Sequence, residues 1–461
     1  SANNLVDNVW GHYYEGIRAA NFYLKETAGL TFDEWKYSDD YEAIMKEFTN
    51  YQYEVRFLRA YFYFELIKRY RNIPFVLDVL AQNEANGVNP ESYEKIAKFI
   101  VDECSDLAQI LPVNYDNFST KEKGRVTRAA AMALKSRVTL YMASPLFSED
   151  SEDKWKQAAE AAYDIIKQKT DLGLDLVPYP QIFNDVNNQK AEVILYRPTG
   201  ESGDFEKANF PIGVEGGKTS TCPTQNLMEA YDMKDGTPFV WNNQSNPYDN
   251  RDPRMKYTIV CNEMKWPVDP VEIWEGGTNG LPLQNATTTG YYLKKYVNNT
   301  ISFEAGSTVT KKQHNWVLFR YGEILLNYAE AMINAFHDPN YKDAVYNMSA
   351  REAVNQIRGR TNISLPGFPS DITEKDFVKR LKNERRVELA FEGHRFWDVR
   401  RWKELGQTAN IYGVKITKNN EVISYEKFLL ETRAVTDNMY FYPIPNTERF
   451  KNPNLGQNPG W

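Results

Sequence analysis

The sequence contains few of the residues that metal and disulfide chemistry require. It has three cysteines and four histidines in 461 residues, and the histidines are far apart with no metal-binding spacing such as HExxH. Three cysteines make no disulfide framework. Cys104 falls on the apolar stripe of a predicted helix, whereas Cys222 and Cys261 are either free or joined to each other. We therefore expect no cofactor and no metal centre, and leave a structural calcium ion open.

An excess of positive charge and a long apolar run are also missing. The net charge is −7 at pH 7, with no basic patch of the kind that neutralises nucleic-acid phosphates or binds anionic lipids. No run approaches the roughly 18 apolar residues of a membrane helix. A signal peptide is absent, and the sequence passes from Ser1 almost directly into a predicted helix. We expect a globular, processed or truncated chain with no nucleic-acid partner.

Aromatic residues, in contrast, are abundant. The chain has 30 tyrosines, 24 phenylalanines and 10 tryptophans, which make up 14% of its residues. Several of these rings lie in loops with no helical or strand stripe that would bury them. An exposed ring can stack on the flat C–H face of a sugar, while amide, carboxylate and guanidinium groups bind the hydroxyls. The candidate ligand-binding residues are Trp241, Trp274, Trp35, Tyr37, Trp266, Tyr248, Tyr291 and Tyr292.

Two of these rings are the preferred candidates because of their neighbours. Trp241 is followed by the amide-rich segment 242–246, and Trp274 is followed by Gly276 and Gly277, which give the backbone freedom. The alternative for every ring is a packing role, since a loop-rich region also needs a small core. Composition does not separate the two uses.

Apolar periodicity predicts helices in both halves of the chain and little regular structure between them. The predicted helices are 10–24, 57–67, 90–112, 127–143, a fifth from about 155, then 316–335, 341–359, 373–391 and 396–405. Between about 178 and 313 the periodicity fades and Gly, Pro, Asn and Thr become frequent, which predicts loops and short strands. The strand candidates are 192–196 and 291–296, and 423–442 is interpreted as a strand or an irregular return.

These elements predict a mainly α protein, with a tetratricopeptide-like scaffold of helix pairs and an inserted irregular lobe. Trp155 and Ala158, for example, fit the first-helix pattern of a tetratricopeptide unit, although such matches are degenerate. We divide the chain into an N-terminal helical scaffold (1–177), a ligand-binding lobe of loops and short strands (178–315) and C-terminal helices with a tail (316–461). The lobe is too long for a plain connection, which favours a functional role.

The segment 383–403 combines many charges with large aromatic rings. On a helix, Glu384 and Glu388 fall on the same stripe as apolar residues, so two carboxylates are predicted to lie in an apolar seam. They are either a general acid and base, as in glycosidases, or members of a lattice of ion pairs. We favour the lattice, with the nearby arginines at 385, 386 and 395 as partners, because arginines hold carboxylates ionised whereas a general acid needs a raised pKa.

This segment resembles the corresponding helix pair of the SusD/RagB family of outer-membrane nutrient-binding lipoproteins of Bacteroidetes. Further family motifs stand in family order: FLRAYFYFELIKRYRNIPFV, GRVTRAAAMALKSRVTLYMASPLF, RDPR, FRYGEILLNYAEA, AVNQIRGR, YPIP and the closing QNPGW. The resemblance therefore covers nearly the whole chain. Two features depart from the family pattern. The family usually has glycine just before the proline at 74, where this chain has Arg71-Asn72, and the family's lipidated N-terminal cysteine is missing.

The resemblance implies a surface-exposed glycan-binding protein of the outer membrane, attached through a lipid anchor that this chain does not contain. It would pass oligosaccharides to a SusC-like TonB-dependent transporter, without a cofactor and without cleaving a bond. Relatives place an aromatic platform in the lobe and near the exit of the first helix. Two alternatives remain: a glycoside hydrolase using Glu384 and Glu388, and a helical adaptor that binds protein or peptide. The identity of the glycan stays open.

Overall fold

The computed structural model describes residues 5–118, 122–149, 151–242, 246–304 and 310–461. The fold is mainly helical with small two-stranded sheets, as the sequence predicted. Internal contacts divide the chain into two compact units. Unit 1 consists of 1–173, 400–403 and 436–461, and unit 2 consists of 174–399 and 404–435. Among the described residues, no helix combines the length and the apolar character that crossing a membrane requires.

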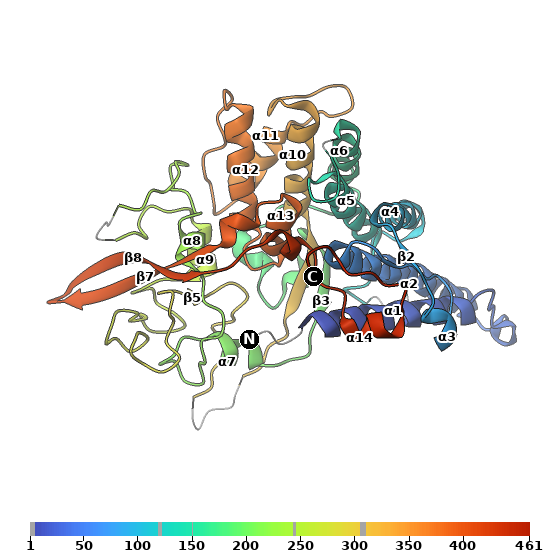
Figure 1. Cartoon of the computed structure of the whole chain (residues 1–461), viewed down its shortest axis with the longest axis horizontal. Helices are drawn as coiled ribbons and strands as arrows, with labels where there is room; N and C mark the ends of the chain where they lie inside the picture. The colour runs from blue at the N-terminus through green and yellow to red at the C-terminus, as the bar shows by residue number, and fades with distance from the viewer. Residues whose placement is uncertain (1–4, 119–121, 150, 243–245, 305–309) are drawn as a thin grey trace. The chain divides into compact units, whose positions relative to one another are not determined.

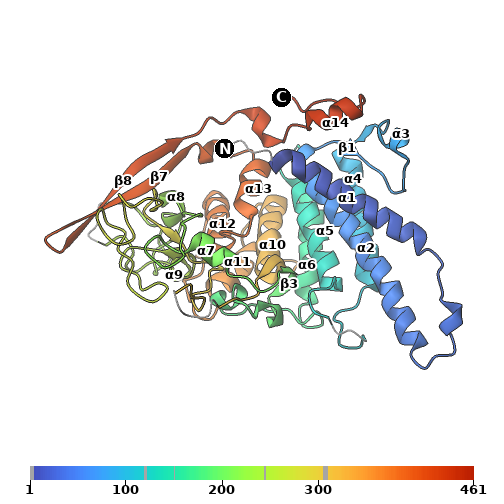
Figure 2. The ribbon, with the colours of Figure 1, turned by 90° about the horizontal axis from the view of Figure 1, so that it is seen from below.

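Unit 1 is built from long helices that pack in sequence order. These are α1 (Leu5–Glu26), α2 (Tyr41–Tyr70), α4 (Tyr93–Ile110), α5 (Arg128–Ala143) and α6 (Glu152–Lys167). Each packs against the next one in this series, and α1 and α2 run side by side (Figure 2). The short elements of the unit are β1 (Ile73–Pro74), β2 (Pro90–Glu91), α3 (Gln82–Ala85), α14 (Asn446–Lys451) and the 3-10 helices η1 (Asp33–Trp35) and η5 (Asp437–Tyr440).

The apolar stripes that predicted these helices are their buried faces. Phe57 and Phe64 on α2 and Ile100 on α4 are fully buried, as is Cys104 on the same stripe. Ala133, on the alanine-rich helix α5, is also fully buried. Its small side chain lets neighbouring helices approach closely, while the large side chains fill the seams between them.

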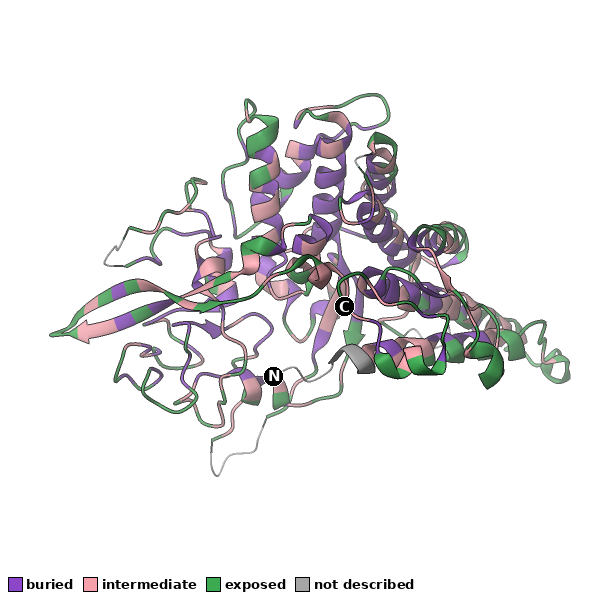
Figure 3. Ribbon diagram, viewed as in Figure 1, coloured by how far each residue is buried: buried purple, intermediate pink, exposed green. Residues whose placement is uncertain are grey.

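Unit 2 combines the predicted lobe with helices from the C-terminal part of the chain. Its helices are α7 (Asp204–Asn209), α8 (Gln225–Met228), α9 (Arg254–Thr258), α10 (Tyr321–Phe336), α11 (Ala350–Arg358) and α12 (Glu374–Glu388), with η2 (Tyr179–Ile182), η3 (Asn187–Gln189) and η4 (Leu405–Thr408). Its strands are β3 (Val193–Pro198), β4 (Ile259–Val260), β5 (Tyr292–Leu293), β6 (Asn315–Arg320), β7 (Asn410–Asn419) and β8 (Val422–Thr432). Helix α13 (His394–Arg401) runs across the division between the units. Helix α10 is buried along nearly its whole length (Figure 3).

One predicted strand is confirmed, and the strand that pairs with it occupies the beginning of a segment that was predicted as a helix. The strand expected at 192–196 is β3, which pairs antiparallel with β6. The helix predicted from 316 is wrong over the first residues, because Val317 and Phe319 pair with Tyr196 and Leu195 in this sheet. Aromatic and β-branched residues favour the extended conformation when a partner strand is available. Helix α10 begins only after this strand, at Tyr321.

The helix predicted over 341–359 is also shorter than expected, because α11 begins at Ala350. Ser349 and Glu352 form a capping box at this point. The Ser349 hydroxyl accepts from the backbone N–H of Glu352 at 3.2 Å, and the Glu352 carboxylate accepts from the backbone N–H of Ser349 at 2.8 Å. The Ser-x-x-Glu pattern is a helix start signal that was present in the sequence.

The segment predicted as a strand or irregular return, 423–442, contains most of β8, which pairs with β7 in a long hairpin (Figure 1). Strand β7 was not predicted. The hairpin packs on the lobe through Val414 and Ile416. Gly290 lies beneath it at φ 84°, where a Cβ atom would come within 2.5 Å of Val414, so this position requires glycine for both space and backbone conformation.

All three cysteines are free. Cys222 and Cys261 are therefore not bridged, which settles the alternative that the sequence left open. Cys104 and Cys261 are buried, and burial raises the pKa of both thiols. Neither thiol is in the ionised form that nucleophilic chemistry requires at neutral pH.

Candidate functional site

The loop between α1 and α2 displays two of the predicted rings. The side chain of Trp35 is 48% exposed and that of Tyr37 is 88% exposed. Phe32 stacks on Trp35 with ring centroids 5.6 Å apart and planes 18° from parallel, and Phe32 in turn meets Phe48 edge-on at 4.7 Å. We call Phe32, Trp35 and Tyr37 the Trp35 shelf. Phe32 thus packs against the indole, which keeps about half of its surface exposed.

The backbone of this loop is held in an unusual conformation. Phe32 has φ 48° and ψ 49°, in the left-handed region that costs a residue with a Cβ atom about 1–2 kcal/mol. Local hydrogen bonds hold the turn: the Thr31 hydroxyl donates to Asp33 at 2.8 Å, and the Trp35 N–H donates to the Phe32 carbonyl at 2.9 Å. Strained residues that the surrounding structure holds in place are found preferentially at functional sites.

The two preferred rings of the lobe, Trp241 and Trp274, are partly buried in unit 2. Both pack against the lobe core and keep part of their surface accessible. The Trp241 ring meets Phe239 at 6.4 Å, and the Lys418 ammonium lies over the Trp274 ring at 4.7 Å. Of the amide-rich segment that favoured Trp241, residues 243–245, which include Asn243 and Gln244, lie outside the described residues.

The other four candidate rings are inside the lobe. Trp266 is 6% exposed, Tyr248 is 8% exposed, and Tyr291 and Tyr292 have no exposed surface. The Tyr291 hydroxyl donates to Gln225 at 2.5 Å, and that of Tyr292 donates to a backbone carbonyl. A loop-rich lobe needs a core, and all four rings belong to it. They therefore offer no open ring face to a ligand. Their burial agrees with the alternative stated above, in which a ring has a packing role.

The buried seam of unit 2 contains the predicted pair of carboxylates, and arginines surround both. Glu388 has no exposed surface and lies 2.8 Å from Arg254, 2.9 Å from Arg320 and 2.8 Å from Arg360. Burial alone would raise the pKa of Glu388, but the three guanidinium groups outweigh it and hold the pKa far below its usual value.

Glu384 is held in the same way. It pairs with Arg254 and lies 2.8 Å from Arg358, and these arginines lower its pKa against the opposing effect of burial. Both carboxylates are therefore ionised at neutral pH, so neither can donate a proton as a general acid. The lattice interpretation is confirmed, and a hydrolase mechanism based on this pair is excluded on electrostatic grounds.

The partners of these carboxylates differ from those predicted. Arg385 instead bonds to Asp398 at 2.8 Å, and Arg395 donates to Gln407 at 2.9 Å. Successive helical residues point about 100° apart, so the residues that follow Glu384 in sequence project from other sides of α12. The true partners come from α9, α11 and the end of β6, and sequence spacing gives no information about these contacts.

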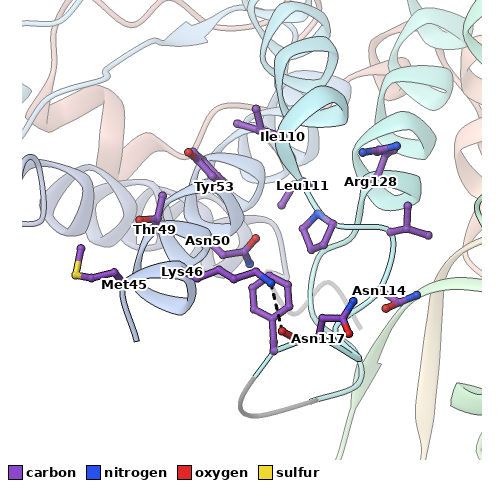
Figure 4. A pocket seen from close by; sticks show the side chains of 13 residues that line it. Met45, Lys46, Thr49, Asn50, Tyr53, Ile110, Leu111, Asn114, Asn117 and Arg128 are labelled. Atoms are coloured by element: carbon purple, nitrogen blue, oxygen red, sulfur yellow. Dashed lines mark hydrogen bonds between the residues drawn. The ribbon is translucent and has the colours of Figure 1, made fainter. Parts of the chain in front are cut away.

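A cavity of about 630 Å³ lies in unit 1, between α2 and the segment that joins α4 to α5. Figure 4 shows the side chains that line it. It is lined by amide and hydroxyl groups, which include Asn50, Asn114 and Tyr53. Lys46 crosses this cavity, donating to the Asn117 carbonyl at 3.2 Å, and its ammonium covers the Phe118 ring at 4.3 Å. The cavity can hydrogen-bond to hydroxyl groups, and the Lys46 ammonium covers the Phe118 ring in its wall.

Two of the further cavities of unit 2 have aromatic rings in their walls. One, of about 390 Å³, has the buried Trp266 in its wall. The Lys294 ammonium lies over that ring at 4.9 Å, so the face toward the cation is covered. The other, of about 840 Å³, lies beside α12 between residues from 229–239, 369–386 and 395–407, and we call it the α12 groove. Sequence analysis did not single out its aromatic wall, Phe239, because the ring has no recognisable pattern around it.

In the part of the chain that the structure describes, no group of three or more His, Cys, Asp or Glu side chains is placed to hold a metal ion. The acidic side chains of the buried seam are neutralised by arginines instead. Asp252, for example, pairs with Arg254 at 2.7 Å.

Comparisons with known proteins cover most of the chain. The profile of the SusD family matches residues 182–461. A second profile, described as starch-binding and associating with the outer membrane, matches residues 1–140. Together the two matches account for both ends of the sequence.

Individual relatives align over almost the full length. SusD-like protein P2 of Formosa agariphila is 23% identical over 481 residues, covering 100% of this chain and 81% of the relative. A SusD-like protein of Bacteroides fragilis superposes with a TM-score of 0.80 at 26% identity, over 99% of this chain and 86% of that structure. A SusD-like carbohydrate-binding protein of Bacteroides fragilis gives the same score and identity over 98% and 86%.

Proposed function

We propose a function for this chain, which belongs to the SusD family. The profile of that family matches more than half of the residues of the chain. The protein is associated with the outer membrane. There it binds oligosaccharides at the cell surface and passes them to a SusC-like TonB-dependent transporter. It releases its ligand unchanged, in keeping with the ionised, fully paired state of Glu384 and Glu388.

The observation that carries this proposal is the Trp35 shelf. An indole supported from behind by Phe32 presents a flat, rigid apolar surface to solvent. Stacking a sugar on such a surface removes apolar area from water and contributes about 1–2 kcal/mol per ring. Two or three such contacts give affinities of roughly millimolar to micromolar order, which allow both capture and release. Trp241 and Trp274 are the corresponding ring candidates of unit 2.

A glycan array, followed by calorimetry on the strongest ligand, tests the shelf. Trp35→Ala removes the indole and is expected to weaken binding about five- to thirtyfold, whereas Trp35→Phe keeps a flat ring and retains more of the affinity. Phe450→Ala is the matched control, because Phe450 is an 87% exposed ring of the same unit outside the shelf. Unchanged affinity in Trp35→Ala would contradict the proposed role of the shelf.

The partnership with the transporter rests on family membership and on the stacked helices of unit 1, an architecture that provides broad contact faces. Co-purification of the full-length lipoprotein with a SusC-like transporter tests it directly. A helical adaptor makes a different prediction. It would bind the transporter or a peptide while showing no heat of binding with any glycan of a broad panel.

A further inference from the structure

The α12 groove contains an arginine without a partner. Arg386 lines the groove, and in the described part of the chain it takes part in no hydrogen bond and no ion pair. A guanidinium group has five N–H donors, and leaving them unsatisfied in a partly buried site is unfavourable. Burial and the like charge of Arg395 both act against it, and they lower the pKa of Arg386 to about 10. The site therefore holds positive charge that the protein does not neutralise.

The acidic side chains beside Arg386 are engaged elsewhere. Glu229, on the groove wall, lies 2.7 Å from the Lys427 ammonium. Glu404 pairs with Lys382 and accepts from Gln407 at 2.8 Å. Since these carboxylates already have cationic partners, the field at Arg386 stays positive.

The remaining charges of the groove do not change the positive field at Arg386. Asp232 is paired with Arg358 at 3.2 Å and Arg380 at 3.5 Å. At the exposed rim, Asp371 and Asp376 stand with Lys375 and Lys379, so that opposite charges balance there. The excess positive charge therefore lies at the Arg386 and Arg395 end.

An aromatic wall stands in the same groove. Phe239 lines it from the side of the lobe, and the Arg251 guanidinium stacks under that ring at 3.6 Å from the centroid. Arg251 is itself buried and donates to the backbone carbonyls of Met228 and Tyr231 at 2.7 Å, so the ring rests on a fixed base. The groove volume, about 840 Å³, is within the range of small-molecule sites.

We propose that the α12 groove binds the negatively charged group of an acidic oligosaccharide, a carboxylate or a sulfate ester, through Arg386 and Arg395. A carboxylate or sulfate oxygen pair matches the planar fork of a guanidinium. The adjoining Phe239 ring can take the sugar face, and the side-chain oxygen of Asn383, whose Nδ2 donates to the Ala230 carbonyl, can accept from its hydroxyl groups. An acidic peptide would satisfy the arginines but would not require the aromatic wall beside them.

This inference rests on the proposed function in one respect, that the anionic group belongs to a sugar. Calorimetry at low ionic strength tests the α12 groove separately from the proposed function. The probes are sodium sulfate, galacturonate, an oligogalacturonate, a sulfated galactan oligosaccharide and neutral maltotriose. We expect the wild type to bind at least one of the two charged oligosaccharides, and to bind it less well as salt screens the arginines. Which of the two binds distinguishes a carboxylate from a sulfate ester as the recognised group.

Variants locate the binding site. Arg386→Gln is expected to weaken binding of the charged oligosaccharide about tenfold or more, while Arg386→Lys keeps the charge but loses the fork and has an intermediate effect. Arg433→Gln is the matched control, because Arg433 is an exposed arginine of the same unit outside the groove. Phe239→Ala should weaken oligogalacturonate binding more than galacturonate binding.

Several results would overturn the proposal: no charged probe binds, Arg386→Gln binds as the wild type does, or Phe239→Ala has no effect while an acidic peptide binds through Arg386. The last result would assign the groove to a protein ligand. If Trp35→Ala abolishes binding of neutral glycans but leaves the charged probes unaffected, the Trp35 shelf and the α12 groove are separate sites. Failure of the α12 groove alone would leave the proposed function intact.

Discussion

Helix α12 carries charged residues on two faces that differ in how their charges are satisfied. On the inner face, Glu384 and Glu388 are buried and each is bonded to at least two arginines. On the face toward the groove, Lys382 pairs with Glu404 at the rim, and Arg386 has no partner among the described residues. The same helix thus contains buried pairs, a partly exposed pair and an unpaired charge.

The surroundings of a charged side chain on α12 indicate whether it stabilises the fold or is available to a ligand. The inner pairs connect α12 with α9, α11 and the end of β6, so they fix the lobe to the helices behind it within unit 2. A buried ion pair adds little net stability compared with an apolar contact, but removing one partner leaves the other buried and uncompensated. A charge without a partner does no such structural work, which leaves it available to a ligand.

The largest effect is expected on the inner face. Glu388→Gln removes the carboxylate that Arg254, Arg320 and Arg360 share, and we expect the free energy of unfolding to fall by about 3–5 kcal/mol. Urea denaturation followed by circular dichroism measures this change. Lys379→Gln, which removes an exposed charge from the same helix, is the control and should change stability by less than about 0.5 kcal/mol. An equally small loss for Glu388→Gln would show that the inner pairs do not hold the unit together.

The inner face should also set the stability of the protein in acid. The pKa values of Glu384 and Glu388, and of Glu392 just beyond the end of α12, are lowered by their cationic partners, so these groups bind protons less readily when the protein is folded. Their contribution is complete above the unfolded-state pKa of about 4.3. It is lost as the pH falls below that value toward the folded-state values.

We therefore expect the urea midpoint to decrease steeply below about pH 4.3 in the wild type. The decrease should be shallower in Glu388→Gln, which lacks one of the titrating groups. Parallel pH profiles for the two proteins would contradict this account. Unfolding series between pH 3 and pH 7 provide the measurement.

The two faces of α12 also show what the sequence was able to predict. Helical spacing placed Glu384 and Glu388 in a buried stripe, and the excess of arginines indicated pairing, because both inferences depend on local order. The partners Arg254 and Arg320 lie more than 60 residues away in the chain. Only the three-dimensional fold brings them together, so local spacing could not identify them.

The same limit applies to the rings and to the strands. Trp35 and Tyr291 both lie in segments without a regular apolar stripe, yet one is half exposed and the other is fully buried. What separates them is tertiary packing, because the β7–β8 hairpin and the lobe segments enclose Tyr291. Strand β6 was missed for a related reason, since its extended form depends on β3, more than 100 residues earlier.

A smaller effect is expected at the rim of the groove. Lys382→Ala removes the ion pair with Glu404, in which both side chains are about one quarter to one third exposed. Solvent screens such a pair, so we expect a loss of at most about 1 kcal/mol. A double-mutant cycle with Glu404→Ala isolates the pair energy, and its value should fall further in high salt. A pair energy as large as the loss of unfolding free energy expected for Glu388→Gln would contradict the distinction between ion pairs at the rim and in the interior.

The smallest effect on stability, and the sharpest contrast, is expected for Arg386→Gln. The substitution breaks no hydrogen bond or ion pair among the described residues, and it relieves the repulsion between Arg386 and Arg395. We therefore expect the free energy of unfolding to stay within about 0.5 kcal/mol of the wild type or to rise. Thermal and urea unfolding of the purified variant measure this. A loss above about 1 kcal/mol would show that Arg386 is a structural residue like its neighbours on the inner face, whereas unchanged stability with loss of anion binding would separate folding from recognition on a single helix.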